Sequence, residues 1–244
     1  MDPDSHDADL RRSVASLGTL ASSELGLEQL LTLVAQYAVQ AIPGADGSGL
    51  TLIEPGRPNT VVATAPFVRA VDDIQYGLMQ GPCVSAAADA TTVISGSLGG
   101  DQRWPQFGSK AARLGVHSAI SIPLLTRDGV VAAMNVYAAP KHAFDGRAAA
   151  LGEAFAEPAA VAVQNAAILA QTRRLAERLQ AAQVSRGITD RAVGILMSRS
   201  GGTAHESLEL LRAISQTEHR KLDDVAQQFI DEAVRRARRH KDRS

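Results

Sequence analysis

The chain has 244 residues, enough for one large domain or two modest ones, and its 45% hydrophobic and 21% charged content is ordinary for a globular protein. The single cysteine, Cys83, excludes an intramolecular disulfide and a multi-cysteine metal site. Residues 1–170 carry 10 Lys and Arg against 16 Asp and Glu, whereas residues 171–244 carry 15 against 10. The basic second part is therefore the one expected to meet nucleic acid, although a solvated basic surface would give the same charge.

The amino terminus is acidic and lacks the apolar core of a secretory signal. No segment reaches the roughly 18 uninterrupted apolar residues that a membrane span needs. We therefore expect a cytoplasmic protein that has no membrane partner. The polar residues 1–9 are expected to be disordered.

The first elements combine helices and strands. Apolar residues recur at helical spacing over residues 10–42 and predict two helices, with a break at Gly26 and an end at the following Pro-Gly pair. Two short segments rich in β-branched residues, 48–54 and 60–64, predict antiparallel strands joined by a Pro/Gly turn.

The middle of the chain ends in a predicted hairpin. A helix or loop is expected over residues 71–83, a short strand within 91–98, and then a helix that stops at Gly115. The apolar runs 116–125 and 130–138 flank an Asp-Gly pair, which is a strong hairpin signal.

A long helical pattern begins after Phe144. Part of it has the alternating spacing of a coiled coil, at Ile168, Thr172, Leu175, Leu179 and Ala182. Two heptads are fewer than the three or four that identify a coiled coil, and a packed amphipathic helix explains the stripe nearly as well. For a connector between domains, we expect a homodimer that pairs through the helix around residues 150–185.

This order of elements predicts an α+β domain, an antiparallel sheet flanked by helices, followed by a long helix that leads into an all-α module of three helices. We expect the first domain at residues 10–170, the connecting helix and helical module at 171–234, and a basic tail at 235–244. The tail is expected to be a disordered electrostatic arm.

Residues 20–170 resemble the GAF domains of actinobacterial regulators. The resemblance rests on three segments, VVATAPFVRAVDDIQYGLMQGPC at 61–83, DQRWPQFGSKAARLGVHSAISIPL at 101–124 and GVVAAMNVYAAPKHAFD at 129–145. It implies a central antiparallel sheet with helices on one side and a pocket for a small-molecule ligand on the other. The ligand and any cofactor stay unassigned.

Tyr76, Cys83 and Trp104 lie in the segments expected to border this pocket, and we take them as its candidate residues. Trp104 is also a candidate core residue. Cys83 could be a redox-sensing thiolate, but it has no basic neighbour in the sequence, so the interpretation as a small buried hydrophobe is favoured.

No catalytic constellation is found. Sulfoxide reduction on a GAF fold uses more than one cysteine, and Cys83 has no partner. The six histidines show no metal-binding spacing, and there is no GxSxG or phosphate-binding glycine loop. We therefore expect that the protein is not an enzyme.

Three amphipathic patterns over residues 186–234 predict three helices that share one core. Thr203 and Glu206 have the spacing of a capping box at the start of the second helix. The module resembles the ANTAR domain, through the segments AVGILM at 192–197, SLELLRAIS at 207–215, and RKL at 220–222 with the Val-Ala pair that follows. Many members of that family have Lys at the position of Val193 and Asn at that of His219.

The resemblance implies binding to RNA hairpins near terminators and prevention of transcription termination, with two copies of the module acting together. Lys and Arg side chains can bind the phosphates of an RNA hairpin, and polar side chains can hydrogen-bond to the unstacked bases of its loop. The candidate phosphate contacts are Arg191, Arg199, Arg212, Arg220 and Lys221. Ser215 and His219 are the candidate base contacts.

The leading hypothesis is an RNA-binding antitermination regulator that a signal at the GAF domain controls. A DNA-binding regulator with a helix-turn-helix is the first alternative, but the charged turn before Leu222 is unlike the tight glycine turn of that motif. A redox enzyme in the GAF domain is the second alternative, and the lone Cys83 disfavours it.

Overall fold

The computed structural model describes residues 3–20, 25–52, 59–127 and 129–241. They belong to two compact units, the first unit (Met1–Ala170) and the second unit (Gln171–Ser244). The first unit has the helices α1 (Pro3–Leu20), α2 (Leu27–Ala41), α3 (Pro66–Leu78), α4 (Pro82–Asp89), the 3-10 turn η1 (Leu98–Gly100), α5 (Pro105–Arg113) and the start of α6 (Gly146–Ser200). Its strands are β1 (Gly47–Leu52), β2 (Asn59–Ala63), β3 (Val93–Ser95), β4 (Ser118–Thr126) and β5 (Gly129–Ala138). The second unit holds the rest of α6, α7 (Ala204–Thr217) and α8 (Leu222–Lys241).

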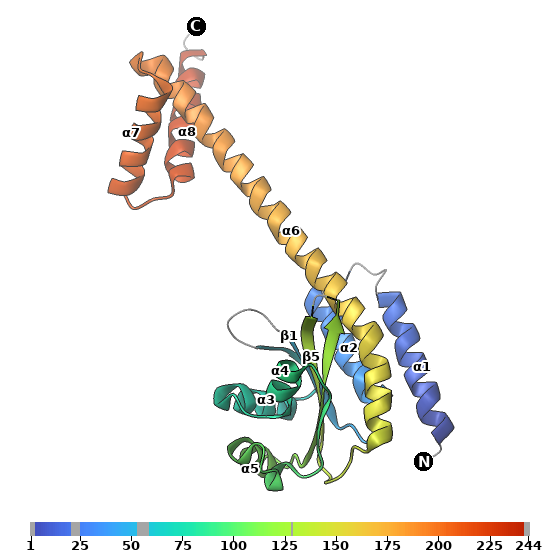
Figure 1. The fold of residues 1–244 in the computed structure, drawn as a ribbon. Helices are drawn as coiled ribbons and strands as arrows, with labels where there is room; N and C mark the ends of the chain where they lie inside the picture. Colours follow the sequence, from blue (N-terminus) through green and yellow to red (C-terminus); the bar gives the residue numbers. More distant parts are fainter. Residues whose placement is uncertain (1–2, 21–24, 53–58, 128, 242–244) are drawn as a thin grey trace. The chain divides into compact units, whose positions relative to one another are not determined.

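The first unit is built on one five-stranded sheet with the order β2-β1-β5-β4-β3, in which all neighbours are antiparallel. Helices cover both faces: α2 and α6 lie on one, and α3, α4 and α5 lie on the other (Figure 1). The pairing of β4 with β5 confirms the predicted hairpin. Its Asp128, and most of the predicted turn between β1 and β2, lie outside the described residues.

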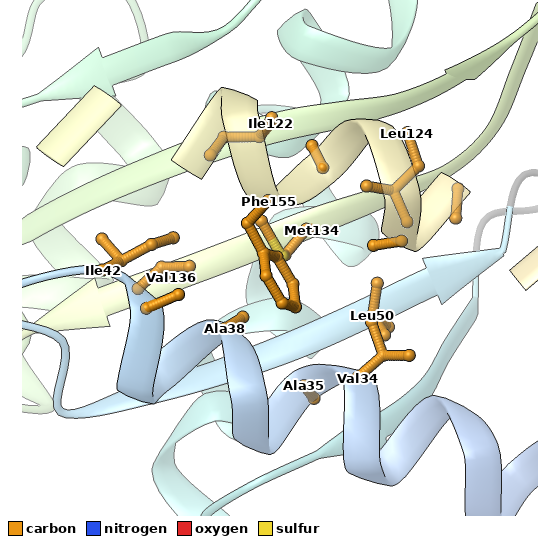
Figure 2. Close-up of a cluster of buried hydrophobic side chains, with 14 of the residues drawn as sticks. Val34, Ala35, Ala38, Ile42, Leu50, Ile122, Leu124, Met134, Val136 and Phe155 are labelled. Atoms are coloured by element: carbon orange, nitrogen blue, oxygen red, sulfur yellow. The ribbon is translucent and has the colours of Figure 1, made fainter. Parts of the chain in front are cut away.

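The apolar core lies between the sheet and the α2 and α6 side. Leu50, Met134 and Ile122 are directly opposed across β1, β5 and β4, and all three are buried. Phe155 of α6 inserts among these side chains and those of α2 (Figure 2). Because alternate residues of a strand point to opposite faces, the residues between these apolar ones face α3 and α4.

The expectation of disorder at residues 1–9 was wrong for residues 3–9, which form the first turns of α1. The Arg147 guanidinium donates a hydrogen bond to the Asp7 carboxylate at 2.6 Å. Farther along α1, Leu17 is buried in the apolar core, and Leu10 and Val14 pack against it. These contacts hold a segment that composition alone would leave unfolded.

The second unit contains the three predicted helices, but the first of them is not separate. It is the end of α6, which runs without interruption from Gly146 to Ser200. The capping box at α7 is confirmed: the Glu206 amide donates to the Thr203 hydroxyl at 3.2 Å, and the Thr203 amide donates to the Glu206 carboxylate at 2.8 Å. The shared core consists of Ala192, Val193, Leu196, Leu211, Val225 and Ala226.

The basic tail also differs from the expectation. Helix α8 continues to Lys241, so the described part of the tail, residues 235–241, is helical and not a disordered arm. The ion pair between Arg236 and Glu232, one turn apart, is typical of a solvated helix. Among the described residues, no helix combines the length and the apolar character that crossing a membrane requires.

Candidate functional site

Two glycines of β1 allow α3 to lie unusually close to the sheet. A β-carbon at Gly47 would lie 2.7 Å from the side chains of Phe67 and Val68. At Gly49 a β-carbon would lie 2.7 Å from Asp72 Oδ2 and 3.0 Å from Val68. Because neither glycine has a side chain, the Asp72 carboxylate can lie directly against the sheet, where it is fully buried.

Asp72 is the centre of a buried polar network. Tyr137 donates its hydroxyl hydrogen to Asp72 Oδ1 at 2.5 Å, and the Asn135 amide donates to the same oxygen at 3.0 Å. Ser121 donates to Asn135 Oδ1 at 2.9 Å, and Gln75 donates to the Tyr137 hydroxyl at 3.4 Å. A polar group buried in this way is tolerated because its partners replace the lost water.

Tyr76 and Cys83 are the outer members of the network. The Tyr76 hydroxyl shares hydrogen bonds with Thr51 Oγ1 at 2.5 Å and with Cys83 Sγ at 3.2 Å, and it accepts one from the Asn135 amide at 3.3 Å. Burial raises the pKa of Tyr76, and the neighbouring Cys83 and Asp72 raise it further. The phenol therefore stays neutral, and it can both donate and accept a hydrogen bond.

Cys83 is a buried neutral thiol. Its side chain is 1% exposed, and burial raises its pKa to about 11. Its backbone amide donates to Gln75 Oε1 at 2.8 Å, which fixes the start of α4 against α3. Cys83 is the second residue of α4, and a helix N-terminus favours a thiolate, but the thiol lacks the partial exposure of reactive thiolates, and its burial outweighs the effect of the helix.

We expect Cys83 to be almost unreactive toward Ellman's reagent in the folded protein at pH 8. A pKa of about 11 instead of 9.0 leaves roughly a hundredth of the thiolate, and burial slows the reagent further. The measurement compares labelling rates in buffer and in guanidinium, where the thiol is free. Fast labelling of the folded protein would contradict this environment and would reopen a redox role.

Trp104 is not joined to the network by the contacts described above. It precedes α5 and packs in a second apolar cluster with Phe107 and Leu98. Its indole nitrogen donates to Ser85 Oγ at 3.1 Å, and the Arg103 guanidinium stacks over its ring at 4.3 Å. Of the three predicted pocket residues, the structure thus brings Tyr76 and Cys83 together and places Trp104 in the core of α4 and α5.

The Asp101 carboxylate beside this tryptophan should make stability depend on pH at the acid end. Its hydrogen bonds from Arg103, and a further one from Ser95, lower its pKa from 3.8 to about 2. Because the folded protein favours the charged form of Asp101, the carboxylate raises the free energy of unfolding above pH 4. This contribution is lost as the pH falls from about 4 toward 2 and the group takes up a proton. We expect Asp101→Asn to be less stable than the wild type at neutral pH and to converge with it near pH 2.

Urea unfolding at a series of pH values measures this difference. Asp89→Asn, which removes an exposed carboxylate of α4, is the control and should parallel the wild type. A difference between Asp101→Asn and the wild type that stays constant down to pH 2 would show that the ion pair with Arg103 contributes nothing.

Six residues of the network were not predicted as site residues: Thr51, Asp72, Gln75, Ser121, Asn135 and Tyr137. A signal for two of them was present in the sequence. Val68, Val71, Asp72 and Gln75 occupy the i, i+3, i+4 and i+7 positions of α3, so Asp72 and Gln75 lie on its buried stripe. Polar residues on an apolar stripe indicate a polar partner on the facing sheet.

Two surface concavities of the first unit lie away from the network. One, of about 450 Å³, lies between α6 and the sheet edge, and Glu153, Glu157, Pro123 and Leu125 are among its lining residues. The other, of about 540 Å³, lies at the start of α3 beside Arg69. Neither is lined by Tyr76, Cys83 or Trp104. The described residues contain no group of three or more His, Cys, Asp or Glu side chains that could hold a metal ion.

Four of the predicted RNA contacts lie at the turn between α7 and α8. Ser215 donates its hydroxyl hydrogen to the Arg220 carbonyl oxygen at 2.6 Å. The Arg220 guanidinium donates to Glu218 at 2.8 Å and to Gln228 at 2.7 Å. Ser215 and Arg220 therefore hold the turn together, whereas the neighbouring His219 and Lys221 have exposed side chains.

The other predicted contacts are more distant. Arg199 precedes the connection between α6 and α7, so the 14 residues of α7, about 20 Å of helix, separate it from the α7–α8 turn. Arg212 is exposed on α7 and pairs with Glu209 at 2.8 Å. Arg191 lies on α6, and its guanidinium donates to the Gly187 carbonyl oxygen at 3.0 Å. The cations thus extend along the unit and do not form one cluster.

The two departures from the family pattern have structural explanations. Val193 is a core residue of the second unit and is 8% exposed. His219 has a φ of 51°, in the left-handed region, where Asn, Asp and His are the most frequent residues after glycine. His219 therefore suits the same backbone conformation as the Asn that it replaces.

Comparison with known proteins gives two matching family descriptions: the GAF domain over residues 24–164 and the ANTAR domain over residues 177–230. A search of curated proteins gave no match. The GAF domain of an Acinetobacter phosphoenolpyruvate-protein phosphotransferase superposes with a TM-score of 0.52 at 14% identity, over 70% of this chain and 99% of that one. The free methionine-R-sulfoxide reductase of Neisseria meningitidis, solved with its substrate, superposes with a TM-score of 0.52 at 15% identity, over 69% and 95%.

At these identities the two solved structures establish a common fold and no common chemistry. The combination of the two domains is that of a signal-transducing regulator. The chain belongs to the GAF domain family, and it carries an ANTAR domain after the GAF domain.

Proposed function

We propose that the protein is an RNA-binding regulator that prevents transcription termination, and that its GAF domain controls this activity. The observation that carries the proposal is the ANTAR domain itself, a basic three-helix module that follows an acidic sensor domain. Nascent RNA hairpins near terminators are the proposed partners, because the polyanionic backbone favours the basic part of the chain.

Among the candidate contacts, exposure favours Arg191, Arg199 and Lys221 as phosphate ligands and His219 as a base contact. Arg220 and Ser215 have a second role in the turn, and Arg212 would have to exchange its ion pair with Glu209 for a phosphate. Substitutions at Arg220 and Ser215 are therefore expected to change the shape of the turn as well as the contact.

Binding of the purified full-length protein to a terminator-overlapping hairpin from its own genome tests the proposal. Removal of a true phosphate contact should lower the affinity for all RNA sequences and reduce the salt dependence of binding by roughly one ion. We expect a variant with Arg191, Arg199 and Lys221 changed to Gln to bind at least roughly tenfold more weakly, with a shallower salt dependence. Lys141→Gln, which removes an exposed cation of the GAF domain, is the matched control.

Absence of salt-sensitive affinity for such hairpins would overturn the proposal. The alternative of a DNA-binding regulator predicts that duplex DNA competes with the hairpin at similar concentrations. The alternative of a redox enzyme needs a reactive thiol, and the buried, neutral Cys83 offers no support for it.

The dimer is the proposed link between the two activities. The helix around residues 150–185 is part of α6, and Leu175 and Leu179 on it are 57% and 60% exposed. Exposed leucines at this spacing support pairing with a second copy. We propose that occupancy of the GAF domain alters the orientation of this helix and so the spacing of two ANTAR domains.

The proposed ligand position lies between the sheet and α3 and α4, where Tyr76 and Cys83 meet the Asp72 network. A ligand there would have to replace the hydrogen bonds of the Tyr76 hydroxyl, so it should carry polar groups. Native mass spectrometry of the purified protein would show whether a small molecule is retained. Retention by the wild type and loss in Tyr76→Phe would support this position.

A further inference from the structure

Helix α8 extends beyond the part of the chain that matches the ANTAR domain. The match ends at residue 230, and among the described residues Ile230 is the last residue of α8 that packs against the core of the second unit. The helix nevertheless continues through residues 231–241. None of residues 231–239 is buried, so packing against the core does not explain this extension.

The extension is strongly basic. Its exposed arginines are Arg235, Arg236, Arg238 and Arg239, and among the described residues only Arg236 has an ion-pair partner, Glu232. Arg235 lies one turn from both Arg238 and Arg239, and like charges at this spacing destabilise a helix. The helix dipole favours cations in the last turn only, so it does not account for Arg235. The fold does not use these cations, whereas a polyanionic partner would.

The extension lies at the end of the second unit that is opposite the α7–α8 turn. Helices α7 and α8 pack together and run in opposite directions (Figure 1). Because α8 has 20 residues and α7 has 14, the end of α8 reaches about 9 Å past the start of α7. Arg199 is exposed just before α7 begins, so it lies at this end too. We call Arg199 and the four arginines of the extension the basic end.

The two ends of the unit differ in charge. The basic end, counted over residues 199–206 and 231–239, has five arginines against three carboxylates, a balance of +2. The turn, counted over residues 215–224, has two cations against three carboxylates, a balance of −1. Phosphates are therefore favoured at the basic end, whereas the turn suits contacts with uncharged bases.

An anionic membrane surface is the other common partner of a basic helix. Helices that bind membranes carry large apolar side chains, such as Trp, Phe and Leu, on the face opposite the cations. The apolar residues of 231–239 are Val234, which is 44% exposed, and two alanines. The composition of the extension therefore favours nucleic acid phosphates over lipid.

We infer that the basic end binds the stem phosphates of the RNA hairpin, whatever the stem sequence, while the α7–α8 turn contacts the loop. The inference deepens the proposed function and rests on it. The stem is assigned to the basic end because duplex RNA is bound mainly through its backbone and shape, whereas sequence is read in unstacked loops. Arginine suits this role because it can donate two hydrogen bonds to one phosphate. The 14 residues of α7 separate the two ends by about 20 Å, so a hairpin lying along α7 meets both.

Fluorescence anisotropy of a labelled terminator-overlapping hairpin, titrated with the full-length protein at several salt concentrations, tests the inference. A variant with Arg235, Arg238 and Arg239 changed to Gln should bind roughly tenfold more weakly and lose roughly two ions of salt dependence. The same factor should separate the variant from the wild type on a hairpin with a changed loop and an unchanged stem, because the stem phosphates remain. Lys at the same three positions keeps the charge and should retain most of the affinity.

The matched control removes three exposed cations from the GAF domain. It changes Lys110, Arg113 and Lys141 to Gln, which alters the net charge by the same amount. This variant should bind the hairpin as the wild type does. Equal weakening by the two Gln variants would show an effect of overall charge and would contradict a contact at the basic end.

Two further results would count against the inference. One is that the wild type and the Gln variant of α8 bind the hairpin with equal affinity and equal salt dependence. The other is that the α8 variant loses binding to phosphatidylserine vesicles and keeps its hairpin binding, which would assign the basic end to a membrane. In both cases the hairpin binding of the wild type leaves the proposed function standing. Absence of hairpin binding by the wild type would remove the proposed function and the inference with it.

Discussion

Replacing Leu211 with Ala is expected to unfold the ANTAR domain at physiological temperature while the GAF domain stays folded. Leu211 is fully buried in a small core, in which six of the described hydrophobic residues are buried. Truncation of a buried leucine costs about 3 kcal/mol, and a unit of this size loses about 5 °C of melting temperature per kcal/mol. The transition of the ANTAR domain should therefore fall by about 15 °C.

The neighbouring residue provides the control for this change. Leu210 is 49% exposed, so Leu210→Ala removes the same atoms without leaving a cavity. Circular dichroism against temperature should show a shifted early transition in Leu211→Ala alone, with the GAF transition unchanged in both variants. Hairpin RNA binding should be lost only in Leu211→Ala. Equal melting of the two variants would show that the three helices do not share the core described above.

Replacing Asp72 with Ala is expected to lower the free energy of unfolding of the GAF domain by about 3 kcal/mol. The change leaves the Tyr137 hydroxyl and the Asn135 amide buried without their common acceptor. Unsatisfied buried donors cost much more than a lost surface hydrogen bond, because water cannot replace the acceptor. Guanidinium unfolding, followed by the fluorescence of Trp104, measures the loss.

Asp73→Ala is the matched control, since Asp73 lies next in the same helix and is exposed. It should change stability by less than about 0.5 kcal/mol. Labelling of Cys83 gives an independent measurement, because loss of the Asp72 network should admit reagent to the thiol. If Asp72→Ala were as stable as Asp73→Ala and Cys83 stayed protected, the network would be a consequence of the fold and not a support for it.

Periodicity predicted the elements that depend on local pattern. The β4–β5 hairpin, the start of α2 after Gly26, and the capping box of Thr203 and Glu206 follow directly from residue types a few positions apart. The eight-residue helix α4 was missed because its sequence, PCVSAAAD, is too short to show a periodic face. The start of α1 was missed because its order depends on a distant contact between Asp7 and Arg147.

The candidate sites were predicted less completely than the fold. Tyr76 and Cys83 are seven residues apart, and their proximity could be expected from one segment of sequence. The contacts of Asp72 with Asn135 and Tyr137 join residues more than sixty positions apart, so they depend on the placement of α3 against β5. For RNA recognition the sequence predicts cations but not their pairings, so the structural role of Arg220 was not foreseen.

The glycines of β1 have a consequence for how this sensor could diversify. Helix α3 can lie close to the sheet because Gly47 and Gly49 have no β-carbon, so the distance between the helix and the sheet depends on these two residues of β1. A single added methyl group there would force α3 away from the sheet and would lengthen the contacts of Asp72 with β5 without altering any residue of the network. The dimensions of the proposed ligand position thus depend on two residues that do not belong to it.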